Sequence, residues 1–233
     1  MFLRGLDTLI QNPGAFFREL LLVMVALFVV GITVHEFSHA LAAHWLGDDT
    51  AKRQGRLSLN PVVHLDPMGT IMLLVAGLGW GKPVPVDGNR LRGGRSGMAR
   101  VALAGPLSNV LAAAFFALPI RTGLLAWHSP FFYEPLVQSS PSWMIADILG
   151  YIIFFNILLA VFNLIPVFPL DGFNILSGVV PASVNLSRYM VIGPVLLLLV
   201  IGADMFLGTN LLWGLLRPPA DLIGRLLVGK SLF

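Results

Sequence analysis

The chain has 233 residues, of which 56% are hydrophobic and only 12% are charged, and its formal net charge is +3. A soluble domain carries charge on about a quarter of its residues, so this composition excludes a soluble globular protein and predicts one surrounded by lipid. Cysteine is absent, which excludes disulfides and thiolate ligands. We expect no nucleic-acid partner, because the net charge is small and eight of the fifteen Lys and Arg residues gather between Lys52 and Arg100, as in a juxtamembrane loop.

Four apolar stretches are long enough for membrane-spanning helices, which need about 20 apolar residues. They cover residues 16–45, 98–120, 141–165 and 188–212. The apolar ends of the chain, residues 2–10 and residues 214–228 around a Pro-Pro break, are predicted to lie along the membrane interface. No internal repeat or linker interrupts this pattern. We therefore predict an all-α polytopic membrane protein in which residues 1–233 form a single domain.

The segment at residues 66–85, DPMGTIMLLVAGLGWGKPVP, has a different pattern. Its continuous apolar run is about half the length that a spanning helix needs, and four glycines interrupt the segment. A short apolar run bounded by Gly and Pro is typical of a re-entrant element that is buried against protein. We predict a re-entrant, β-hairpin-like loop here.

The distribution of cationic residues between the loops predicts the orientation of the protein in the membrane. Residues 47–100 carry eight cationic side chains, whereas residues 121–140 carry only Arg121. Because cytoplasmic loops are enriched in Lys and Arg, the long basic loop at 47–97 is predicted to be cytoplasmic. Both termini and the 121–140 loop then lie outside.

The first predicted helix contains the sequence His35-Glu36-Phe37-Ser38-His39. Residues four apart on a helix face the same way, so both histidines can bind one metal ion, and Glu36 lies next to them. This spacing suits zinc. The alternative is a polar face on an amphipathic helix, but ionisable groups deep in a spanning segment are costly and usually functional.

A catalytic zinc ion takes three protein ligands, and without cysteine the third must be His, Asp or Glu. Asp171 is the best candidate, because Pro166 and Pro169 are predicted to break the third helix just before it. Asp147 and Asp204 are weaker candidates near the outer ends of the third and fourth helices.

Four motifs give the chain a specific resemblance. They are HEFSH at 35–39, GRLSLNPVVHLDPMGT at 55–70, AGPLSN at 104–109 and NLIPVFPLDG at 163–172. In this order they resemble the site-2 protease family (M50) of intramembrane zinc metalloproteases, and in particular its compact bacterial branch without a PDZ domain. One departure is Phe173, where many relatives carry a smaller residue.

The resemblance implies that His35, His39 and Asp171 bind one catalytic Zn²⁺, that Glu36 is the general base and that Asn109 assists at the reaction centre. It implies hydrolysis of peptide bonds within or near transmembrane segments of membrane-protein substrates, in a lipid bilayer that is expected to be the bacterial inner membrane.

Several alternatives stay open at this point. Buried His and Asp residues also mark ion pathways, so the chain is alternatively a transporter or channel. A metal-retaining but inactive membrane adaptor is a second alternative, although it would usually lose Glu36. Asn109 either donates to a developing oxyanion or forms a polar clamp between helices, and the roles of His64 and Asn163 are undecided.

Overall fold

The computed structural model describes residues 12–76, 79–130, 140–181 and 183–233. The predicted interfacial stretch at 2–10 lies outside these ranges. The long elements are α2 (Pro13–Met24), η1 (Val25–Ile32), α3 (Thr33–Trp45), α6 (Arg95–Arg121), α7 (Pro141–Asn163), α9 (Ser187–Gly202) and α10 (Leu211–Val228). The shorter ones are α4 (Thr50–Arg53), η2 (Pro61–His64), α5 (Pro67–Ala76), α8 (Asp171–Val179) and η3 (Ala203–Leu207).

Four helical stretches of the described chain are long and apolar enough to cross a membrane. They are Phe16–Trp45, Arg95–Arg121, Pro141–Asn163 and Ser187–Leu207, which confirms the four predicted helices. The last stretch ends five residues before the predicted boundary. It ends there because Gly208 and Asn210 adopt positive φ, a conformation that a right-handed helix cannot contain.

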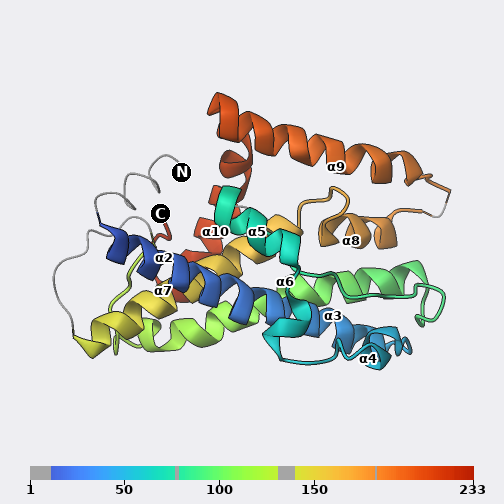
Figure 1. Ribbon diagram of the computed structural model, residues 1–233. Helices are drawn as coiled ribbons and strands as arrows, with labels where there is room; N and C mark the ends of the chain where they lie inside the picture. The colour runs from blue at the N-terminus through green and yellow to red at the C-terminus, as the bar shows by residue number, and fades with distance from the viewer. Residues whose placement is uncertain (1–11, 77–78, 131–139, 182) are drawn as a thin grey trace.

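Helix α6 organises the packing, because it contacts α3, α7, α8 and α10. Its buried face consists largely of small residues, which let neighbouring helices approach closely: Gly97, Ala102, Gly105, Ala113 and Ala117. Figure 1 shows the continuous α2–α3 helix, α6 and α7 side by side, with α9 apart from them on the side of α8. Only 6% of the most apolar window of α9 is buried, so lipid must cover most of its surface.

The prediction of a β-hairpin-like loop at 66–85 is wrong for the described part of that segment. Residues 67–76 form the helix α5, and the described chain shows a single isolated β-bridge here, between Leu65 and Gly81. A helix starts at this place because Asp66 accepts a hydrogen bond from the Gly69 N–H and Pro67 occupies the first helical position. The following residues 82–87 have no regular secondary structure, and Pro83 and Pro85 favour extended backbone there.

The prediction for residues 214–228 also needs correction. Helix α10 continues through Pro218 and Pro219 instead of breaking there. Both prolines are exposed, while Leu216 and Ala220 on the opposite face are buried in the main hydrophobic cluster with residues of α6 and α7. This packing compensates for the backbone hydrogen bonds that two prolines remove.

Candidate metal centre

His35 and His39 lie on one face of α3, as their four-residue spacing requires. Both side chains are buried, and their rings meet edge to face with centroids 4.6 Å apart. The rings pack directly against α6 at Gly105. A Cβ atom there would lie 2.4 Å from His39 Nε2 and 2.7 Å from His35 Cε1, so only glycine leaves room for the two imidazoles.

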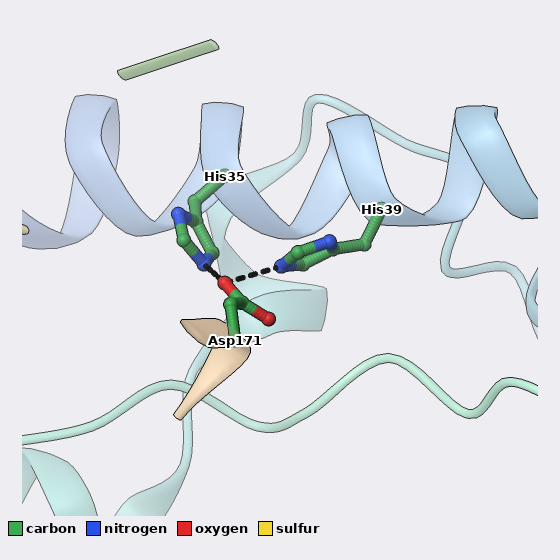
Figure 2. A group of neighbouring side chains, drawn as sticks. All are labelled: His35, His39 and Asp171. Atoms are coloured by element: carbon green, nitrogen blue, oxygen red, sulfur yellow. Dashed lines mark ion pairs between the residues drawn. The ribbon is translucent and has the colours of Figure 1, made fainter. Parts of the chain in front are cut away.

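Asp171 reaches the histidines from the first residue of α8 (Figure 2). Helix α7 ends at Asn163, and the turn containing Pro166 and Pro169 returns the chain to the pair. The Asp171 Oδ2 atom lies 3.0 Å from His35 Nε2 and 3.2 Å from His39 Nε2. The helix break predicted from the two prolines therefore brings together residues that are more than 130 positions apart.

The hydrogen bonds of the two rings decide which nitrogen carries the proton. His35 Nδ1 lies 2.6 Å from Asn109 Oδ1, and His39 Nδ1 lies 2.7 Å from the carbonyl oxygen of Val101. Both partners are acceptors, so each Nδ1 must donate and each neutral ring presents the lone pair of Nε2.

These three converging atoms fit a metal ion. The two Nε2 lone pairs face a carboxylate oxygen, Asp171 Oδ2, which is buried and receives no hydrogen bond from the described residues. When both rings are neutral, these three acceptors have no proton between them and repel one another unless a cation lies among them. Ligands about 2.0–2.1 Å from a tetrahedral zinc ion are separated by about 3.3 Å, close to the spacing of these atoms.

Glu36 is held by the extended segment Gly81–Asp87, here called the strap. The N–H of Val84 donates to Glu36 Oε2 over 3.0 Å, between two prolines that have no N–H to offer. Glu36 is half-buried. The bond ties the carboxylate beside the histidine pair to a main-chain donor 48 residues away.

Buried polar groups anchor the strap on the N-terminal side of Val84, at Lys82. The N–H of Lys82 donates to the His64 carbonyl over 2.8 Å, and the Arg56 guanidinium donates to the Lys82 carbonyl. Burial lowers the pKa of Arg56, and the negative charge of Glu36 opposes that shift.

At the far end of the strap, the N–H of Asp87 donates to Asp48 Oδ2 over 2.7 Å. Burial raises the pKa of Asp48, but the hydrogen bonds from Thr50 and Asp87 outweigh it and hold that pKa below its usual range. Asp48 therefore stays ionised at neutral pH.

Asn109 lies at the centre of this packing with no exposed surface. Its amide nitrogen donates to the Gly31 carbonyl and to Asn156 Oδ1, each over 2.9 Å, while its oxygen accepts from His35. Both N–H groups are thus engaged. This arrangement matches the clamp between helices better than an oxyanion donor.

The other candidate residues lie elsewhere. Asp147 pairs with His128, and Asp204 accepts hydrogen bonds from Thr209, Leu211 and Leu212 at the start of α10. Asn163 bonds the Leu159 carbonyl within α7, and His64 bonds the Ser58 carbonyl.

Phe173 packs edge to face against Phe168, beside a small cavity of about 60 Å³ between α8 and α9. The side chain is buried there. It does not displace Asp171 from the histidine pair.

Sequence reasoning missed three residues that the structure ties to the site: Asn156, Val84 and Arg56. Asn156 had a usable signal, since it is an amide within the apolar run GYIIFFNILLAVF. Val84 had none, because it acts through its main chain. Arg56 was counted only as one of the cations of the basic loop.

Comparison with known proteins decides the family. A family model described as "Peptidase family M50" matches residues 123–201, which include Asp171. YwhC of Bacillus subtilis (strain 168), which is named as a zinc metalloprotease, is 37% identical over 205 residues, covering 87% of this chain and 90% of YwhC. This chain belongs to peptidase family M50.

A second relative has the same descriptive name. Rip2 of Mycolicibacterium smegmatis is 28% identical over 162 residues, which cover 67% of this chain and 56% of Rip2. No solved structure matches. The M50 membership confirms the resemblance drawn from the four motifs.

Proposed function

We propose that this M50 peptidase is an intramembrane zinc metalloprotease that hydrolyses peptide bonds within or near transmembrane segments of membrane proteins. The observation that carries the proposal is the convergence of His35 Nε2, His39 Nε2 and Asp171 Oδ2, with both histidines inside a spanning helix. These three residues hold one Zn²⁺. When bound, the ion polarises the scissile carbonyl and activates water for attack.

Glu36 is the general base and then the general acid of the proposed reaction. It follows His35 directly on α3, so its carboxylate lies beside the metal ligands. It takes the proton of the attacking water and delivers it to the leaving amine nitrogen, which completes hydrolysis without a covalent intermediate. The Val84 N–H keeps the carboxylate oriented.

Asn109 supports this reaction as a positioning residue. Because its N–H groups bond Gly31 and Asn156, its contribution is to hold His35 in the tautomer that binds metal. This role replaces direct assistance to an oxyanion.

Two alternative functions are less well supported. A transporter or channel moves its ion between sites, whereas here both imidazoles are locked by Nδ1 hydrogen bonds to acceptors on α6. An inactive adaptor does not need a carboxylate beside the ligands. Membership of a peptidase family favours neither.

The domain and orientation of the chain are part of the same proposal. Residues 1–233 form one domain, which the contacts of α6 with four other helices support. The basic loop at 47–97 faces the cytoplasm of a bacterial cell, because of its seven-to-one excess of cations over the 121–140 loop.

Single cysteines test this orientation in a chain that has none of its own. Arg95 and Thr122 are exposed at opposite ends of α6, which is about 40 Å long. An impermeant thiol reagent should label Arg95→Cys and Thr122→Cys from opposite faces of the membrane. Labelling of both from one face would refute the orientation and the span of α6.

Proteolysis is tested with the purified protein in lipid vesicles and a synthetic transmembrane peptide of known sequence. We expect one bound zinc per chain and cleavage within or beside the apolar stretch, abolished by a zinc chelator and restored by added Zn²⁺. A chain that binds no zinc, or cleavage that persists after the zinc has been removed, would contradict the proposal.

A further inference from the structure

Two buried side-chain amides link the main chain of α7 to the metal centre by hydrogen bonds. The Nδ2 of Asn156 donates to the Ile152 carbonyl over 2.8 Å, and Asn156 Oδ1 accepts from Asn109 Nδ2 over 2.9 Å. Asn109 Oδ1 in turn lies 2.6 Å from His35 Nδ1. Asn156 and Asn109 have no exposed surface, so no water competes for these bonds.

The donor and acceptor roles in this series of hydrogen bonds are fixed at both amides. Main-chain carbonyls only accept, so the Asn156 atom that faces Ile152 must be nitrogen and the one that faces Asn109 must be oxygen. In the same way the Gly31 carbonyl requires the Asn109 nitrogen on its side. The only Asn109 atom left for His35 is therefore the oxygen, which places the ring proton on Nδ1.

The two histidines are supported differently. His39 donates to the main-chain carbonyl of Val101, a partner that no side-chain substitution removes. His35 depends on a side chain, and that side chain depends on a second one from α7. Asn156 is thus coupled to His35 and not to His39.

We propose that Asn156 is a positioning residue for the metal centre, acting through Asn109 to hold His35 in its metal-binding tautomer and orientation. The inference rests on the proposed metal site but not on proteolysis. Without Asn156, one N–H of Asn109 is left buried and unpaired, a state that favours rotation of the amide or displacement of its helix. Either change removes the acceptor that His35 Nδ1 needs.

Three substitutions separate this role from packing. Asn156→Leu removes all hydrogen bonding at similar size. Asn156→Ser keeps a hydroxyl that can bond the Ile152 carbonyl on its own helix but is too short to reach Asn109. Asn156→Asp preserves the acceptor for Asn109 and, when protonated, a donor for Ile152. Ile157→Val, at the adjacent buried position on α7, controls for packing defects alone.

The first measurement is zinc affinity in the purified full chain, by competition with a chelator of known affinity. Loss of a hydrogen-bond partner behind a metal ligand weakens binding about 10–100-fold. We expect the Kd to rise about tenfold for Asn156→Leu and Asn156→Ser, with Asn156→Asp and Ile157→Val close to the unsubstituted chain. In an Asn109→Leu background, Asn156→Leu should add little, because its route to His35 is already cut.

The second measurement is the hydrogen bond of each imidazole Nδ1–H in the zinc-loaded protein, from ¹H–¹⁵N spectra of histidine-labelled chain. We expect the Nδ1–H signal of His35 to shift as its hydrogen bond to Asn109 weakens in Asn156→Leu and Asn156→Ser, while the Nδ1–H signal of His39 stays in place as an internal control.

The possible results distinguish a failure of this inference from a failure of the proposed function. Unchanged zinc affinity and an unchanged His35 Nδ1–H signal in Asn156→Ser would overturn the inference, as would equal changes at both histidines or an undiminished effect in the Asn109→Leu background. Should Asn156→Leu fail to fold, Asn156→Ser and its rescue by Asn156→Asp decide the question. An unsubstituted chain that binds no zinc would instead contradict the proposed function.

Discussion

The two sides of helix α3 that form the site are built in different ways. On the metal side, His35 and His39 are buried against α6, and they meet an aspartate at the first residue of α8. On the base side, Glu36 is half-buried and is held by the extended strap through one main-chain N–H. Long packed helices position the ligands, whereas a non-helical segment positions the base.

This difference teaches that binding metal and activating water can be altered separately. Displacing a ligand on the metal side requires moving a helix in a close-packed interior, where small changes in volume are felt. The base depends on the strap, whose anchors are individual hydrogen bonds to Asp48, Arg56 and His64. Substitutions on each side should therefore give different combinations of zinc content and activity.

The largest expected effect is on the base side. Glu36→Gln preserves shape but removes proton transfer, so the rate of peptide cleavage should fall about 10²–10⁴-fold while one zinc per chain remains. Cleavage rates and metal analysis of the same preparation check this. Normal cleavage by this variant would remove Glu36 from the mechanism.

On the metal side, Asp171→Ala should lose zinc on dialysis and activity with it, because it deletes the only anionic ligand. We expect zinc affinity to fall by at least about tenfold. The matched controls are Asp147→Ala and Asp204→Ala, whose carboxylates bond His128 and the start of α10. Zinc retained by Asp171→Ala and lost by a control would refute the ligand assignment.

Gly105→Ala tests whether close approach to α6 sets the geometry of the metal side. The new methyl would lie 2.4 Å from His39 Nε2, so the rings must shift, and we expect zinc affinity to fall about tenfold. Gly202→Ala is the control, since a Cβ there meets nothing within 4 Å. Equal zinc affinity in both variants would show that the rings tolerate the methyl.

A change in the strap should affect the cleavage rate alone. Val84→Pro removes the N–H that bonds Glu36, and losing a hydrogen bond to a charged group costs about 1.5 kcal/mol, or about tenfold in cleavage rate. Zinc content should not change, and Val84→Ala, which keeps the N–H, should cleave normally. A loss of zinc in Val84→Pro would show that the strap also supports the metal side.

Local sequence was enough to predict much of this protein. The four apolar stretches predicted the four spanning helices because the need to bury about 20 apolar residues in lipid is a property of each stretch by itself. Helical periodicity places the His35 and His39 side chains on the same face of the helix. The break after α7 follows from Pro166 and Pro169, which made Asp171 available to the pair.

Local sequence also contains a signal for the start of α5. Asp66-Pro67 places a capping side chain directly before a proline, which is a helix-start signal, whereas the glycines of that segment favour a turn. The continuation of α10 through Pro218 and Pro219 was not predictable in this way, because burial of its opposite face decides it.

Only the tertiary structure decided which atoms support the site. The bonds of Asn109 to His35, of Asn156 to Asn109 and of Val84 to Glu36 join residues 74, 47 and 48 positions apart. At such separations no periodicity relates the partners. Their meeting depends on how α6, α7 and the strap pack against α3, and the free energy of that packing is shared among many contacts that no short segment of sequence contains.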